Sequence, residues 1–126
     1  MNWVGEKFDK NNPDRFDRKW ICQQIRKDLK EAFGKEWKIT VKKDSWNSIE
    51  LTIRKCPTEF LTEEARNMKD FAFALNAQKY VDESIVNKIA NIANAYNYDN
   101  SDGMTDYFDR NYYLHIGIDF NKQFWK

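Results

Sequence analysis

The segment from residue 99 to residue 109 is the part of the sequence richest in groups that could do chemistry. It holds four carboxylates and two neighbouring aromatic rings, namely Asp99, Asp102, Asp106, Tyr107, Phe108 and Asp109. Closely spaced carboxylates are typical of calcium-binding loops. If Gly103 is aligned with the invariant glycine of an EF-hand loop, Tyr98 falls at the first ligand position and Asp109 at the last. The first position needs a carboxylate and the last a bidentate Glu, so the EF-hand pattern fails.

Three interpretations of this acidic segment remain open. Asp99 and Asp102 can accept hydrogen bonds from nearby backbone N–H groups and fix a tight turn, as Asp commonly does. The segment can instead be a partner-binding loop anchored by Tyr107 and Phe108, because buried aromatic side chains supply much of the energy of protein interfaces. The third interpretation is an irregular Mg²⁺ or Ca²⁺ site in a metal-dependent hydrolase. Turn formation is the commonest of these roles, and we predict no metal and no cofactor.

The remaining reactive side chains do not form a catalytic set. His115 is the only histidine, and nothing in the sequence places Cys22 or Cys56 beside it. Nucleophilic catalysis needs a hydroxyl or thiol held against its base. The four glycines do not form a phosphate-binding loop pattern. We therefore predict that the protein is not an enzyme and that both thiols are reduced and half-buried.

Basic residues are concentrated in the first predicted helix and just after it. The helix carries Arg18, Lys19, Arg26, Lys27 and Lys30, and the following segment carries Lys35, Lys38, Lys42 and Lys43. Such a cluster can follow a nucleic-acid backbone by neutralising its phosphates. Acidic residues alternate with it and weaken any continuous positive field, namely Asp17, Asp28, Glu31, Glu36 and Asp44. The plainer interpretation is a solvated face with ion pairs between successive helix turns.

Apolar periodicity predicts a helix followed by a hairpin in the first half of the chain. A helix is expected over 14–33, entered through a Pro-Asp pair, because apolar residues recur at spacings of three and four. Gly34 stands where a C-terminal cap belongs. Alternating residues predict strands over 37–41 and 49–53, which would form an antiparallel hairpin with Trp46 at its tip. An exposed Trp46 would mark a protein-binding surface.

The second half of the chain predicts two helices and a final strand. The helices are expected over 62–77 and 82–96, and the strand over 112–120. The order α-β-β-α-α-β indicates an α+β fold with helices packed on one face of a three-stranded antiparallel sheet. Residues 1–13 are expected to form an irregular N-terminal arm, and the chain of 126 residues to form a single domain.

The composition excludes several classes of protein. With 21 Lys and Arg against 20 Asp and Glu, the net charge is +1, which argues against an acidic mimic of DNA and against a strongly basic coat protein. No apolar run approaches the roughly 20 residues that a membrane span needs. The start of the chain lacks the apolar core of a signal peptide. We expect a cytoplasmic protein with no membrane partner.

Parts of the sequence resemble a known class of mobile-element domains. The segments are 25–33, 38–41, 48–53, 96–102, 106–109 and 112–113. Together they resemble a small domain of the large polyvalent protein-associated class, which occurs in phages and mobile elements of bacteria. The resemblance implies a phage or mobile-element protein acting inside a bacterial cell, and it carries no catalytic residues.

Two functions follow as expectations. The first is a non-catalytic, stoichiometric inhibitor that binds a host protein of a bacterial defence system, CRISPR–Cas or restriction machinery. Its expected contact residues are Trp46, Asp99, Asp102, Asp106, Tyr107, Phe108 and Asp109. The alternative is a nucleic-acid-binding accessory protein that uses the basic face of the first helix.

Overall fold

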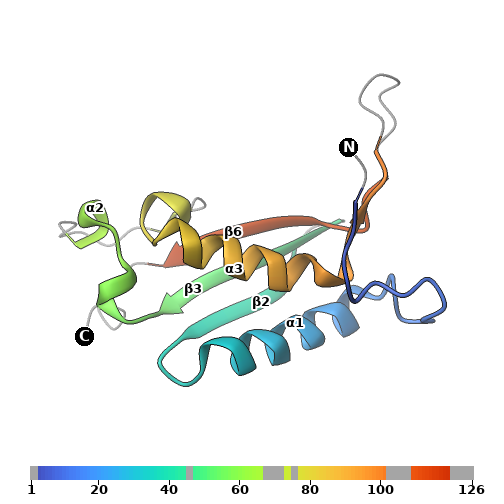
Figure 1. The fold of residues 1–126 in the computed structure, drawn as a ribbon, viewed down its shortest axis with the longest axis horizontal. Helices are drawn as coiled ribbons and strands as arrows, with labels where there is room; N and C mark the ends of the chain where they lie inside the picture. The colour runs from blue at the N-terminus through green and yellow to red at the C-terminus, as the bar shows by residue number, and fades with distance from the viewer. Residues whose placement is uncertain (1–2, 45–46, 67–72, 75–76, 102–108, 120–126) are drawn as a thin grey trace.

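The computed structural model describes residues 3–44, 47–66, 73–74, 77–101 and 109–119. Its elements in chain order are β1 (Trp3–Val4), α1 (Arg18–Phe33), β2 (Lys38–Asp44), β3 (Ser48–Lys55), η1 (Thr58–Phe60), α2 (Glu63–Arg66), β4 (Phe73–Ala74), η2 (Ala77–Lys79), α3 (Glu83–Ala93), η3 (Asn94–Tyr96), β5 (Tyr98–Asp99) and β6 (Tyr113–Asp119). The fold is α+β, as predicted, with α1 and α3 packed beside the main sheet (Figure 1). None of the described helices has the length and apolar character needed to cross a membrane.

The main sheet is mixed and four-stranded, which corrects the predicted three-stranded antiparallel sheet. Its strand order is β2-β3-β6-β4, and β3 pairs with β6 in parallel. Parallel neighbours need a long crossover connection, usually through a helix, and α3 lies in the connection between β3 and β6. Alternation in the sequence shows that a strand forms but carries no information on its direction. The short strands β1 and β5 make a separate antiparallel pair.

Helix α1 presents a buried stripe to the sheet, as its periodicity predicts. Ile21, Cys22, Ile25 and Leu29 are all buried. The helix begins later than expected, because its cap is Asp17, whose carboxylate accepts hydrogen bonds from the backbone N–H groups of Lys19 and Trp20. Asp14 was the predicted cap and lies in the preceding turns. The helix ends at Gly34 as predicted, at φ 77°, a left-handed conformation that favours glycine.

The hairpin of β2 and β3 forms as predicted, and its strands are antiparallel. Ile39 lies opposite Ile53 and Val41 opposite Leu51, with these side chains toward α1 and the core. Thr52 of β3 is also buried, and only 2% of it is exposed. Its strand lies in the middle of the sheet, where Thr40 and Gly117 flank it on the neighbouring strands.

The helix expected over 62–77 is confirmed at Glu63–Arg66 and wrong at 73–74 and 77, while residues 67–72 and 75–76 lie outside the described residues. Helix α2 covers Glu63–Arg66, and Thr62 caps it by accepting a hydrogen bond from the Ala65 N–H. Residues 73–74 are instead a strand beside β6, and 77–79 form a 3₁₀ turn. The apolar residues here fit alternation as well as helical spacing, and pairing with β6 decides between them. The third predicted helix is confirmed as α3, capped by Asp82.

The N-terminal arm is not irregular throughout, because β1 pairs with β5 and the next residues dock on the end of α3. The Gly5 N–H donates to the Asn97 carbonyl at 2.7 Å and the Lys7 N–H to the Ala95 carbonyl at 2.8 Å. A Cβ atom at Gly5 would collide with the carbonyl oxygens of Asn94 and Ala95. The close approach of these backbones therefore requires glycine.

We expect Gly5→Ala to lower the free energy of unfolding by about 1–3 kcal/mol, the range for overpacking in a well-packed region. The collision is with backbone, which cannot rotate away, so β1 must shift. Urea unfolding followed by circular dichroism measures the change. Gly34→Ala separates collision from backbone strain: its Cβ meets no atom within 4 Å, so its loss of about 1–3 kcal/mol comes from its positive φ alone. A Gly5→Ala variant as stable as wild type would contradict the docking described here.

Candidate nucleic-acid interface

Helix α1 separates its charges onto two sides, although they alternate in the sequence. Lys19, Arg26 and Lys30 are spaced by seven and four residues and share the side next to β2. Asp28 lies on the other side, where its carboxylate accepts hydrogen bonds from Lys7 Nζ at 2.9 Å and from the Tyr96 hydroxyl at 2.5 Å. Burial would raise the pKa of Asp28, but these two hydrogen bonds outweigh it and hold that pKa below its ordinary value.

The edge strand β2 and the turn before it supply more positive charge to the same side. Lys35, Lys38, Lys42 and Lys43 are all exposed there. Together with Lys19, Arg26 and Lys30 they line two hollows between α1 and β2, of about 410 and 390 Å³. Arg26 lines both, so the hollows adjoin. We call this feature the α1–β2 groove, and none of the described residues that line it is Asp or Glu.

The floor of one hollow is apolar. Leu29, Phe33, Trp37 and Ile39 line it beneath the cationic side chains. The Phe33 and Trp37 rings lie 4.9 Å apart, and Trp37 lies 5.4 Å from the ring of Phe60. Trp37 lies just before β2, is half-buried and borders this opening.

The structure brings together three of the five helix residues predicted for nucleic acid. Lys19, Arg26 and Lys30 line the groove. Arg18 is held internally, because its guanidinium donates to the side chain of Asn47 and to the Asn111 carbonyl at 2.6 Å. Lys27 is exposed on α1 and lines neither hollow. The only sign in the sequence that β2 adds positive charge to the groove is the lysines at 38, 42 and 43.

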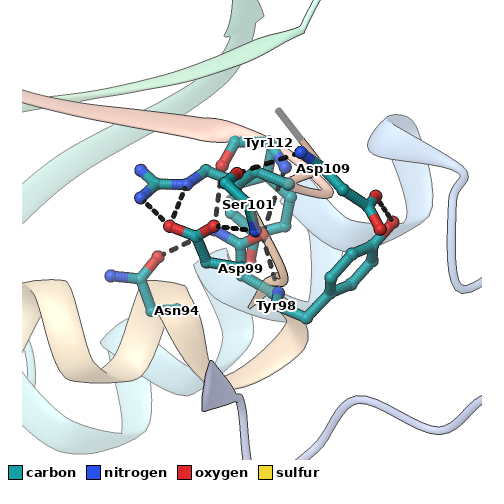
Figure 2. A network of polar contacts seen from close by, with 8 residues as sticks. Asn94, Tyr98, Asp99, Ser101, Asp109 and Tyr112 are labelled. Carbon is teal, nitrogen blue, oxygen red and sulfur yellow. Dashed lines mark hydrogen bonds and ion pairs between the residues drawn. The ribbon is translucent and has the colours of Figure 1, made fainter. Parts of the chain in front are cut away.

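Among the residues predicted for protein binding, the structure describes Asp99 and Asp109. Trp46, Asp102, Asp106, Tyr107 and Phe108 lie outside the described residues. Asp99 accepts a hydrogen bond from the Ser101 N–H at 2.9 Å and forms an ion pair with Arg110 (Figure 2). This confirms the turn-forming role predicted for Asp99.

Asp109 is bonded to the same short segment. Its carboxylate accepts from the Tyr98 hydroxyl at 2.9 Å, and its N–H donates to Ser101 Oγ at 2.9 Å (Figure 2). The Asn100 N–H donates to the Asp109 carbonyl at 2.7 Å. Asp99 and Asp109 therefore help to hold residues 98–101 against residues 109–110. The described residues contain no group of three or more His, Cys, Asp or Glu side chains placed to hold a metal ion.

We expect the Asp99–Arg110 ion pair to make the free energy of unfolding depend on pH in the acid range. The Arg110 hydrogen bond and the Ser101 N–H lower the pKa of Asp99 to about 2, against about 3.9 for an unfolded chain. A folded-state pKa below the unfolded value stabilises the protein above about pH 4, and this stabilisation is lost as the pH falls toward 2. Asp99→Asn should therefore lower the free energy of unfolding at pH 7, and its difference from wild type should close between pH 4 and 2. Urea unfolding at several pH values measures this.

A difference between Asp99→Asn and wild type that stays constant from pH 7 to 2 would show that the ion pair is not what stabilises the turn.

The two thiols are buried and unpaired. Burial raises the pKa of Cys56 to about 12, so its reactive thiolate is scarce at neutral pH. Burial also raises the pKa of Cys22, and the nearby cations Arg26, Lys43 and Arg18 offset only part of that.

The fold and the site together define an α+β domain whose helix and edge strand form a cationic groove. Searches against protein-family models, curated proteins and solved structures found no match to this chain.

Proposed function

We propose that this protein binds single-stranded nucleic acid in the α1–β2 groove. The observation that carries the proposal is the convergence of seven cationic side chains on two adjoining hollows without a described carboxylate among them. When such side chains neutralise the phosphates of a nucleic acid, its condensed counterions are released, and this release favours binding. The two acids of α1, Asp28 and Glu31, line a hollow on the other side of the helix, where Asp28 is bonded to Lys7 and Tyr96. Asp17 caps the helix.

The length of the groove fits a short stretch of backbone. Lys19 and Lys30 are separated by about 16 Å of helix, and Lys38 and Lys43 by about 16 Å of strand. At roughly 3.4 Å per phosphate in a stacked strand, the groove spans about five phosphates.

The apolar floor favours a single strand over a duplex. A nucleobase has flat apolar faces and its phosphate is anionic, which matches an aromatic floor beneath a cationic rim. Trp37 and Phe33 supply that floor in the hollow that Lys30, Lys35 and Lys38 surround. In a duplex the base faces are stacked on one another and cannot reach it.

A salt titration tests the proposal. Fluorescence anisotropy with a labelled 20-nucleotide single strand and the matching duplex is measured from 50 to 200 mM salt. Neutralising about five phosphates of a single strand gives a log–log slope of about −3.5, and the single strand should bind more tightly than the duplex. Absence of binding at 50 mM salt, or an affinity that does not change with salt, would overturn the proposal.

The stoichiometric inhibitor of a bacterial defence system stays a prediction from the sequence resemblance. Asp99 and Asp109, the two described residues chosen for it, are engaged within their own turn. A mobile-element protein that covers single-stranded nucleic acid is consistent with the same resemblance.

A further inference from the structure

The α1–β2 groove consists of two hollows that differ in their lining. One, which we call the aromatic hollow, has the floor of Leu29, Phe33, Trp37 and Ile39 described above. The other, which we call the cationic hollow, is lined by Lys19, Cys22, Gln23, Arg26, Lys42 and Lys43. Four of its six described lining residues are cations, against four of nine in the aromatic hollow. Positive charge is therefore most concentrated in the cationic hollow, which has a volume of about 410 Å³.

Arg26 lies between the two hollows and is held in one orientation. Its Nε and Nη2 groups both donate to the Val41 carbonyl, the Nε at 3.0 Å. These bonds use two of the five N–H groups of the guanidinium. The other three have no hydrogen-bond partner within the described part of the chain. An arginine held in this way offers a fixed fork that can donate to two oxygens of one phosphate.

The charges around the cationic hollow act on its floor. Cys22 lies there, and burial raises the pKa of its thiol. Arg26 and Lys43 oppose that rise, because a nearby cation stabilises a thiolate. An anionic ligand that enters the hollow would be stabilised by the same two charges.

The cationic hollow stands at one end of the groove. α1 and β2 run side by side in opposite directions (Figure 1), so Lys19 near the start of the helix lies across from Lys43 near the end of the strand. Asp17 and Asp44 are exposed just beyond these lysines, and their negative charges repel any further phosphate. At the other end Glu36 is flanked in the chain by two lysines, which offset its charge. We therefore expect a nucleic-acid strand in the groove to end at the cationic hollow.

A terminal phosphate suits this hollow better than an internal one. An internal phosphate is a diester with a single negative charge. A terminal phosphate is a monoester, which carries a charge of about −1.5 to −2 at pH 7 and three acceptor oxygens. The four cations of the hollow repel one another, and a dianion relieves that repulsion more than a monoanion does. The Arg26 fork needs two of the three oxygens, which leaves one for a lysine.

We propose that the cationic hollow binds the terminal phosphate of a single strand whose bases extend toward the aromatic hollow. This binding mode rests on the proposed function and names the strands that the groove selects, which are those that end in a phosphomonoester. Cys22 and Leu29, one from each hollow, are seven residues apart, which is about 10 Å of helix. At roughly 3.4 Å per nucleotide, about the third or fourth base from the phosphate reaches Trp37.

Three 10-nucleotide single strands of one sequence test this binding mode on the full-length protein. One carries a 5′ phosphate, one a 3′ phosphate and one neither, and each has an internal fluorophore. Affinities are measured by anisotropy at 0.1 M salt and pH 7.5. Because each neutralised charge changes affinity about fivefold at this salt concentration, one phosphorylated strand should bind at least about fivefold more tightly than the unphosphorylated strand. The other should gain less than about twofold, because a chiral groove accommodates one strand polarity better than the other.

The outcomes separate this terminal-phosphate site from the proposed function. Equal affinities of the three strands, with the salt dependence expected of the groove, would overturn the site and leave the proposed function standing. An equal gain for both phosphorylated strands would show attraction by total charge and would also overturn the site. Absence of binding by every strand at 50 mM salt would overturn the proposed function and the site together.

Two double variants locate the site within the groove. Lys19→Ala with Lys43→Ala removes lysines from both sides of the cationic hollow, and the preference for the phosphorylated strand should fall below about twofold. Lys35→Ala with Lys38→Ala removes the same charge from the aromatic hollow. This second variant should weaken all three strands to a similar degree and keep the preference. A preference that survives equally in both variants would overturn the site.

Discussion

Replacing Lys19, Lys30 and Lys42 together with Ala should weaken binding of single-stranded nucleic acid about 100-fold at 0.1 M salt. These three lysines line the α1–β2 groove from both its helix and its strand side. If each neutralises one phosphate, its loss removes about 0.7 from the log–log salt slope and about fivefold in affinity at this salt concentration. The slope should therefore fall by about 2, and anisotropy across the salt range measures both quantities.

A second triple variant removes the same charge from elsewhere on the surface. Lys10, Lys27 and Lys79 are exposed, and none of them lines the α1–β2 groove. Replacing them with Ala should change affinity by less than about threefold, because phosphate contact requires proximity. Equal losses in the two triple variants would mean that net charge, rather than the groove, attracts the ligand.

Asn97→Ala should lower the free energy of unfolding by about 2–4 kcal/mol, a large fraction of the usual 5–15 kcal/mol of a domain. Only 1% of Asn97 is exposed. Its Nδ2 donates to the Tyr112 carbonyl at 2.9 Å, and its Oδ1 accepts from the Tyr112 N–H at 3.1 Å and the Tyr98 N–H at 2.9 Å. Truncation leaves the buried backbone groups of Tyr112 without their partner, and an unsatisfied buried group costs about 1–3 kcal/mol.

Urea unfolding measures this loss, with Asn91→Ala as the control. Asn91 is exposed on α3, six residues earlier in the chain. Its truncation should change stability by no more than about 0.5 kcal/mol. A comparable change in the two variants would show that the network around Tyr112 does not hold the start of β6 to the end of α3.

The helices and strands that follow from the local spacing of apolar residues could be predicted from the sequence. Helix α1, the β2–β3 hairpin, α3 and β6 each have an apolar side that must be buried, and their periodicity shows it. The direction of β6 and the strand at 73–74 could not be predicted from the sequence, because both depend on which strands pair with β6. That choice is made by tertiary packing between segments that are 65 residues apart for β3 and β6 and about 45 apart for β4 and β6.

The candidate site could be predicted only in part, for a similar reason. The basic residues of α1 are visible in the sequence, but so are the acids between them. Their separation follows from helix geometry and from the partners of Asp28, Lys7 and Tyr96, which come from distant segments. The role of Arg18 in holding Asn47 and Asn111 is likewise invisible without the fold.

Amide chemical-shift mapping with a 10-nucleotide single strand locates the binding surface on the protein. The largest shifts on titration should fall within residues 19–30 and 35–43, the two sides of the α1–β2 groove, and they should fade as salt is raised. Shifts confined to other parts of the chain, or none at 50 mM salt, would contradict binding in this groove.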